Sequence, residues 1–265
     1  MSLTTPDLVP AASRGDRSRS TGALRAMLKS EARLLTRNPG VVIWSTVLPV
    51  AAAIVLACIP AIREPSKDFG GLSFFHVYQP ILVLFALTLL AVQSLPDVLT
   101  RYREMGVLKR LRTTPASPAL LLFAQLALTL MVSIGCTVLM TVVPALVGAS
   151  WPRNMAGFVL AYLLAAWALL GLGLLIGSLF RNAKVAAGFG TLLFFVLEFF
   201  AGLWLQRPNM PAWMRHISDF TPSGAGAQAL TDSAVGHWPQ LLHLVVLAAW
   251  GAAMSTTSVR LFNWE

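Results

Sequence analysis

One acidic side chain lies in the middle of a long uncharged stretch and has the clearest chemical potential in this sequence. Glu198 falls within the apolar run 185–205. Placing a carboxylate in an apolar environment is costly, so it either has a function or is protonated or hydrogen-bonded for structural reasons. The functions that fit are a proton relay, a substrate contact and one half of an ion pair. Because no Lys or Arg lies in another such run, Glu198 alone would make a poor proton pathway, and both interpretations stay open.

Motifs of enzymes and of nucleotide sites do not occur in the chain. The sequence contains no His-Glu-x-x-His, no Gly-x-Ser-x-Gly, no Cys-x-x-Cys and no Gly-x-x-x-x-Gly-Lys-Ser/Thr phosphate loop. The histidines also lack the spacing of metal ligands. We therefore expect no catalytic residue, no metal site and no cofactor on this chain. ATP and Mg²⁺, if used, would be bound by another chain.

A basic segment between two apolar runs is the most specific local pattern. Residues 101–112 carry five basic side chains, and Leu108 and Leu111 add an apolar edge. The segment is typical of a cytoplasmic loop, and its apolar edge could dock another protein. The residues that we expect in this contact are Arg101, Arg103, Glu104, Leu108, Lys109, Arg110, Leu111 and Arg112.

The composition places these patterns in a membrane protein. The chain is 56% hydrophobic and only 12% charged, with a mean hydropathy of +0.70, and a soluble domain with these values would expose large apolar patches. About 20 apolar residues cross a hydrocarbon core as a helix. The sequence thus predicts an all-α integral membrane protein with six transmembrane helices, at about 41–62, 77–96, 119–147, 155–180, 185–205 and 238–259.

The distribution of charge predicts the orientation of these spans. Fifteen of the 20 basic residues fall on one alternating set of connections, which includes both ends of the chain. By the positive-inside rule both termini are cytoplasmic. The formal net charge of +9 is explained by orientation and by contact with anionic lipid, without nucleic acid. Arg outnumbers Lys by 16 to 4, which favours a G+C-rich bacterial genome and hence a bacterial plasma membrane.

Three further segments carry recognisable patterns. Residues 1–21 have no apolar core of a signal peptide and are expected to form a disordered cytoplasmic tail. Residues 24–37 have the period of an amphipathic helix, which we expect in the inner membrane interface. The connection 206–237 is too short for a domain and predicts short outer helices that dip back toward the membrane. The expected contact residues of the amphipathic helix are Arg25, Lys29, Glu31, Arg33 and Arg37.

Small residues recur four apart in two neighbouring spans. Gly173 and Gly177 lie in the fourth span, and Ala186 and Gly190 lie in the fifth. Such pairs let helix backbones approach closely. We expect them to serve packing within one chain, with a dimer seam as the alternative.

Several of these motifs together resemble a known family. They are Arg37-Asn-Pro39 before the first span, Arg103-Glu-x-Gly106-x-Leu-Lys-Arg-Leu-Arg112-x-Thr-Pro115-x-Ser-Pro118, and the outer Gly202...Met210-Pro211-x-Trp213...Thr221-Pro222. In this order they resemble the permease subunit of type-2 ABC exporters, the group that contains daunorubicin-resistance permeases. The resemblance covers residues 22–265, and the cytoplasmic motif is its most specific part.

The resemblance implies a six-helix half-transporter without its own nucleotide site. It would pair with a second copy of itself or a related permease and with two copies of a separate ABC ATPase. Residues 101–112 would form a coupling helix against that ATPase, flanked by residues 24–37. The second and fifth spans of two subunits would line a path for an amphipathic drug-like or lipid-linked compound, as in antibiotic resistance. On this chain the path residues would be Glu198, Phe199 and Gln93.

Two other functions fit the sequence. A proton-coupled secondary transporter would use Glu198, transport without ATP and fail when Glu198 is replaced by Gln. A membrane scaffold would bind a partner without transport. The substrate is not specified by the sequence, since transport pockets are mostly generic apolar surface.

Overall fold

The computed structural model describes residues 43–66, 71–106, 118–149 and 151–261 of the chain. This part of the chain is helical and contains no strand. Its elements are, in order, η1 Ile43–Val47, α3 Leu48–Cys58, α4 Pro60–Arg63, α5 Phe74–Leu89, η3 Leu90–Ser94, α6 Leu95–Glu104, α8 Pro118–Leu146, α9 Met155–Leu179, α10 Ala183–Ala201, η4 Arg207–Asn209, α11 Ala212–Phe220, α12 Pro222–Val235 and α13 Leu241–Leu261.

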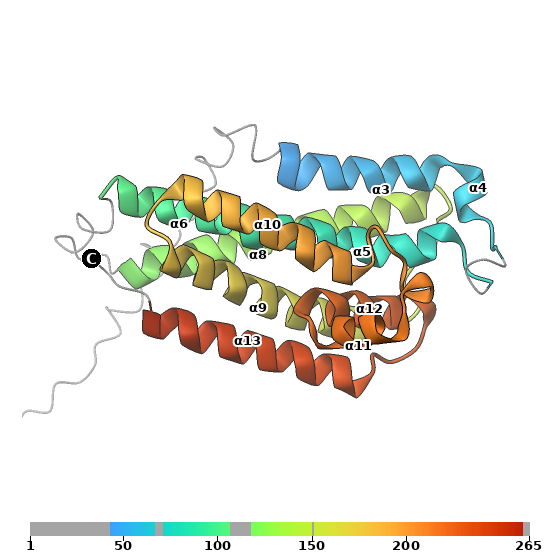
Figure 1. Cartoon of the computed structure of the whole chain (residues 1–265). Helices are drawn as coiled ribbons and strands as arrows, with labels where there is room; N and C mark the ends of the chain where they lie inside the picture. Colours follow the sequence, from blue (N-terminus) through green and yellow to red (C-terminus); the bar gives the residue numbers. More distant parts are fainter. Residues whose placement is uncertain (1–42, 67–70, 107–117, 150, 262–265) are drawn as a thin grey trace, which may run out of the picture.

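The long helices run side by side, and the chain reverses at the end of each (Figure 1). Among the described residues, five helices are long and apolar enough to cross a membrane. The 25 residues of α9 extend about 37 Å at 1.5 Å per residue, which exceeds a hydrocarbon core of about 30 Å. The described part of the first apolar helix, Ser45–Cys58, is shorter. The prediction of an all-α membrane fold is confirmed. The five helices are Phe74–Glu104, Leu121–Leu146, Met155–Leu179, Ala183–Ala201 and Leu241–Leu261.

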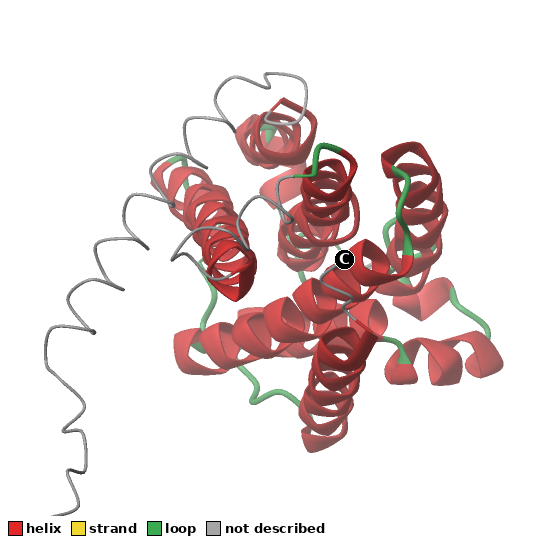
Figure 2. Cartoon of the chain, turned by 90° about the vertical axis from the view of Figure 1, so that its left-hand side faces the viewer, coloured by secondary structure: helices red, strands yellow, loops and turns green. Residues whose placement is uncertain are grey.

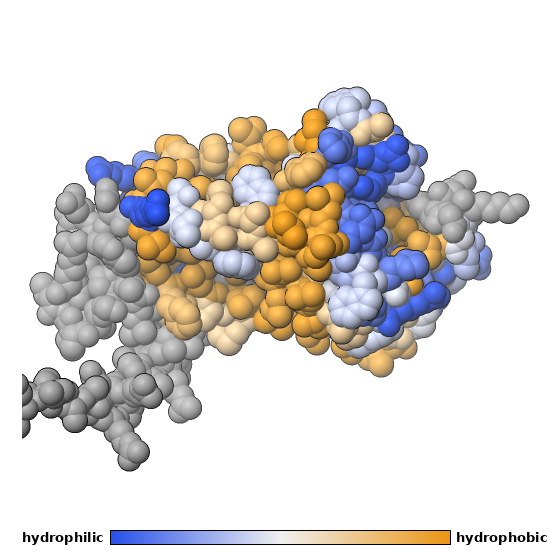
Figure 3. Space-filling model, turned by 90° about the horizontal axis from the view of Figure 1, so that it is seen from below, coloured by the Kyte–Doolittle hydropathy of each residue, from blue (hydrophilic) through white to orange (hydrophobic). Residues whose placement is uncertain are grey.

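The two ends of the bundle differ in their elements. α4, α11 and α12 lie at one end, and α6 and α13 finish at the other (Figure 1). We call these the outer end and the inner end, after the orientation that the charges predict. Seen from the inner end, most long helices appear nearly end-on (Figure 2). In the view of Figure 3 an apolar surface covers the length of the bundle, and hydrophilic side chains gather where α11 and α12 lie.

α9 is the central helix of the core. It packs along α13 and also against α12 and α6. Gly251 on α13 makes room for the ring of Trp167 on α9, whose Nε1 donates to Ser255 Oγ at 3.0 Å. In a membrane the hydrophobic effect does not drive helices together, because the surrounding lipid is itself apolar. Close contacts through small residues and polar side chains stabilise the bundle instead.

The second apolar helix contains a π-helical segment in its middle, η3. The carbonyl of Ala91 lies against Gly173 on α9, and the carbonyl of Val92 lies against Gly190 on α10. A Cβ atom at either glycine would collide with the carbonyl group that faces it. These glycines therefore pack within one chain, as expected. The close approach fixes the second apolar helix against both α9 and α10.

The outer connection folds into two different helices. α11 is amphipathic and exposes Trp213, Ile217 and Phe220. α12 begins at the N-cap Thr221, whose side chain accepts from Gly224 N, and its small residues are buried against α5, α9, α10 and α13. Ala, Gly and Ser suit such a position because their size lets four helices approach. The predicted short outer helices are therefore present.

The structure differs from the predicted end of the second span. The helix does not end at residue 96 but continues to Glu104, and an ion pair between Arg101 and Asp97 supports the added turns. It ends because Gly106 has φ = +65°, a conformation that Gly adopts at little cost. Residues 101–104, the start of the predicted coupling helix, therefore belong to α6, and residues 107–112 lie outside the described part.

Smaller differences occur at other span ends. The first span ends at Cys58 instead of residue 62, because the chain turns at Ile59 before Pro60. The fifth ends at Ala201 instead of 205, where Gly202 at φ = +95° caps the helix. The sixth begins at Leu241 instead of 238. The third and fourth spans agree with prediction to within one residue.

Candidate functional site

The inner end of α6 is fastened to the turn between α9 and α10. Arg103 Nη1 donates to the carbonyls of Gly177 at 2.9 Å and Ser178 at 3.0 Å, which belong to the last turn of α9. Glu104 Oε1 accepts from Ala183 N at 2.7 Å, the first residue of α10. We call these contacts of Arg103 and Glu104 the inner clamp.

The chemistry of helix ends explains this clamp. The last carbonyls of a helix and the first N–H groups of the next lack partners within their own helices. The partial negative charge at the end of a helix favours a cation, and the partial positive charge at the start of the next helix favours an anion. Arg103 and Glu104 are adjacent and of opposite charge, so they serve both ends at once. Asn182 completes the arrangement by accepting from Lys184 N and Val185 N.

A buried carboxyl lies between α5 and α10. Glu198 has 0% exposure, and neither of its oxygens has a hydrogen-bond partner among the described residues. The hydroxyl of Thr88 is close enough to influence this carboxyl, but it donates to Leu84 O at 2.8 Å. An unsatisfied buried carboxyl requires an explanation, such as a proton, a water or a role in function.

Of the other two predicted path residues, Phe199 follows Glu198 directly on α10, whereas Gln93 lies apart from it. Gln93 is half-buried on η3, and its backbone lies beside Gly190, about 12 Å before Glu198 along α10. Phe199 is half-buried and its ring meets Phe200 edge to face at 5.6 Å. The described chain therefore does not bring Gln93 and Glu198 together. π-helical segments such as η3 are frequent at functional sites.

Titratable side chains from four elements meet at the outer end. Asp219 Oδ1 on α11 accepts from Arg207 Nη2 of η4 at 2.7 Å and lies 3.0 Å from His243 Nε2 of α13. Asp232 on α12 is close enough to feel the charges of Arg207 and His243. Burial raises the pKa of the Asp232 carboxyl above its usual value, more strongly than these neighbours lower it. We call Arg207, Asp219, Asp232 and His243 the outer cluster.

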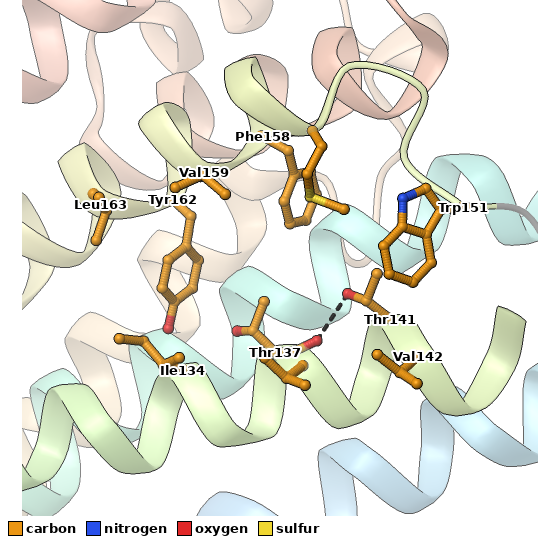
Figure 4. Close-up of a pocket in the computed structure, with 11 residues that line it drawn as sticks. Ile134, Thr137, Thr141, Val142, Trp151, Phe158, Val159, Tyr162 and Leu163 are labelled. Atoms are coloured by element: carbon orange, nitrogen blue, oxygen red, sulfur yellow. Dashed lines mark hydrogen bonds between the residues drawn. The ribbon is translucent and has the colours of Figure 1, made fainter.

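An apolar groove of about 320 Å³ opens between α8 and α9 (Figure 4). Trp151 stands at one end of it, and Phe158 and Tyr162 point into it from α9. Tyr162 OH donates to Ser133 Oγ at 2.8 Å, so its one polar atom is satisfied. The groove has almost no polar surface, and an apolar surface of this kind suits lipid chains.

Residues 22–234 match the family model described as ABC-2 type transporter. The chain belongs to the ABC-2 type transporter family. It is thus a multi-pass membrane permease component of an ABC transporter, a type of protein that in general works with an ABC ATPase and in dimers. No curated protein matches the chain.

The predicted contact residues of the permease fall into two groups. Arg101, Arg103 and Glu104 are described: Arg101 is exposed beside Asp97, whereas Arg103 and Glu104 make the inner clamp. The others lie outside the described residues. These are Leu108, Lys109, Arg110, Leu111 and Arg112 in the basic segment, and Arg25, Lys29, Glu31, Arg33 and Arg37 in the amphipathic segment.

Sequence reasoning missed the inner clamp and the outer cluster of the permease. A signal for the clamp was present: Arg103 and Glu104 are adjacent and of opposite charge, and the short connection Phe180-Arg181-Asn182 between two apolar runs presents two helix ends. The outer cluster had no such signal. Its members come from η4, α11, α12 and α13, and no spacing in the sequence relates them.

Proposed function

We propose that this permease is the membrane subunit of an ATP-driven exporter in a bacterial plasma membrane, with both termini in the cytoplasm. Two copies, or one copy and a related permease, would enclose the substrate path. Two copies of a separate ABC ATPase would bind ATP and Mg²⁺. In line with the resemblance to daunorubicin-resistance permeases, the proposed cargo is an amphipathic drug-like or lipid-linked compound.

The inner clamp is the observation that carries this proposal. Arg103 and Glu104 bind α6 to the ends of α9 and α10 through backbone atoms, and η3 is pressed against both of these helices. A force applied to the basic segment after α6 would thus move three helices together. Packed helices respond to such a force as units, which is what coupling to nucleotide-driven closure needs.

The uncovered face of α10 supports a path between two subunits. This helix is only one-third buried within the chain, and its exposed side chains include large apolar ones. In the proposed dimer, α10 and the second apolar helix of each copy would face each other across the path. The exposed apolar residues of α10 are Val185, Phe189, Leu192, Phe195 and Val196.

Purification of the tagged permease in mild detergent tests the partnership. Mass spectrometry should find a stoichiometric phosphate-loop ATPase, and vesicles that hold both chains should hydrolyse ATP in response to cargo. Replacing Leu108 and Leu111 by Asp should lower ATPase recovery at least fivefold and abolish transport. Leu241→Asp, the same change at an exposed position of the outer end, is the control. Full ATPase recovery and transport in the double variant would contradict the coupling role.

A proton-coupled secondary transporter is the second candidate, favoured by the unpartnered carboxyl of Glu198. It requires transport driven by a pH gradient without ATP. Glu198→Gln should then abolish that transport while the protein remains folded, because Gln preserves the shape of the side chain. In the exporter, transport should instead persist in this variant and still need ATP.

A further inference from the structure

An amphipathic cavity lies at the outer end, beside the outer cluster. Its volume is about 510 Å³, and it is formed by α5, η4, α11 and α12 with the end of α10. We call it the outer pocket. Its apolar wall includes Val77, Ile81 and Ala201, and its polar wall carries two arginines, Arg207 and Arg215.

Among the described residues, the polar wall of the outer pocket contains cations and neutral donors but no acid. Gln206, Gln228 and Thr231 accompany the two arginines, and neither acidic residue of the outer cluster lines the pocket. Asp219 is already occupied by Arg207 and His243. An anion in the pocket would therefore meet donors and positive charge, without an opposing carboxylate among the described residues of the wall.

One arginine of this wall also carries a donor nitrogen that is buried without a partner among the described residues. Arg207 binds Asp219 through Nη2, but its Nη1 has no hydrogen-bond partner among the described residues although it is shielded from solvent. A buried guanidinium nitrogen without an acceptor is costly. A phosphate or carboxylate oxygen would satisfy it, because the guanidinium fork suits planar and tetrahedral anions.

We propose that the outer pocket binds the anionic head group of an amphiphile, with its apolar part against Val77 and Ile81. The head group is a phosphate or carboxylate that contacts Arg207 and Arg215. It belongs either to an anionic lipid of the outer leaflet or to the cargo. The binding site itself does not depend on the proposed export function, whereas its occupation by cargo rests on that function.

Photo-crosslinking in nanodiscs of neutral lipid tests this binding. The probe is an alkyl phosphate with a diazirine on its chain, and an alkyl trimethylammonium with the same chain and diazirine is the charge control. The phosphate probe should label peptides that contain Val77 to Ile81 and Gln206 to Arg215, and the ammonium probe should label them at least fivefold less. Equal labelling by the two probes would overturn the proposal.

Two variants locate the charge that selects the anion. Arg215 is exposed and no ion pair is described for it, so Arg215→Gln should reduce phosphate labelling at least fivefold. Arg207→Lys keeps a cation for Asp219 but removes the second guanidinium nitrogen, and should reduce labelling about threefold. Arg153→Gln removes the same charge from an exposed position at the same end but outside the pocket. Equal losses in Arg215→Gln and Arg153→Gln would also overturn the site.

The lipid composition separates the two sources of the anion. If the occupant is a lipid, nanodiscs that are half phosphatidylglycerol should suppress labelling of the wild-type pocket at least fivefold. If it is cargo, labelling should be independent of phosphatidylglycerol. The assay needs no ATP and no partner. Charge-selective labelling of a permease whose purification yields no ATPase would refute export and keep the site, and ATP-driven transport by a permease that shows no such labelling would do the reverse.

Discussion

Charged side chains at the inner and outer ends of the bundle are satisfied to different degrees. At the inner end, Arg103 and Glu104 bind backbone groups of α9 and α10, so their charges are satisfied within the chain. At the outer end, Arg207 has one nitrogen bound and one buried without a partner among the described residues, beside a cavity of about 510 Å³. The inner end is closed by its own residues, and the outer end leaves binding capacity unused.

This difference separates transmission from recognition. Contacts to backbone atoms of helix ends move with those helices, so the inner clamp suits the transfer of motion. A side-chain nitrogen without an acceptor suits the capture of a ligand, because binding removes an existing cost. In the middle of the second apolar helix, η3 contacts Gly173 and Gly190.

Loss of the middle contact should have the largest effect, since it forces apart the closely packed backbones of η3 and α9. Gly173→Ala places a Cβ against the carbonyl of Ala91, and overpacking against backbone should cost about 3 kcal/mol of unfolding free energy. Gly188→Ala, on α10 with open space around its Cβ, is the control and should be neutral or slightly stabilising. Thermal unfolding in detergent measures both, and equal melting temperatures would refute the close contact.

Breaking the inner clamp should have an intermediate effect confined to the inner end. Arg103→Gln removes a half-buried cation from the carbonyls of Gly177 and Ser178, which should cost about 2 kcal/mol. Arg101→Gln, two positions away, removes only an exposed ion pair with Asp97 and should cost less than about 0.5 kcal/mol. Hydrogen exchange at the first residues of α10 should increase in the first variant alone. Similar losses of stability in both variants would contradict a stabilising role of the inner clamp.

The smallest effect is expected from the outer cluster and depends on pH. Burial raises the pKa of Asp232 in the folded protein, so this carboxyl favours folding least when it is ionised. Stability is thus lost as the pH rises from the pKa of a free Asp to the raised value. Asp232→Asn should be more stable than the wild type by less than about 1 kcal/mol at pH 7, with no difference below both pKa values. A difference that is independent of pH would contradict the shift.

The sequence predicted the helical membrane fold because long apolar runs admit few alternatives. It also predicted that Gly173, Gly177 and Gly190 would serve close packing, and the approach of Ala91 and Val92 confirms this for Gly173 and Gly190. It placed the end of the second span eight residues early, because a change in polarity marks the end of an apolar run and not the end of a helix. The charged residues 101–104 continue α6 since nothing before Gly106 stops a helix.

The sequence by itself determined three features through its composition and the order of its residues. They are a multi-pass helical permease, the basic segment after its second span, and Glu198 as a carboxyl in an apolar run. Only the tertiary structure decided that Arg103 and Glu104 bind the turn between α9 and α10, that Glu198 and Gln93 lie apart, and that Arg207, Asp219 and His243 meet beside a cavity. The reason is physical. Apolar periodicity acts between neighbouring residues, whereas these contacts join residues more than ten positions apart, and packing alone brings them within hydrogen-bond distance.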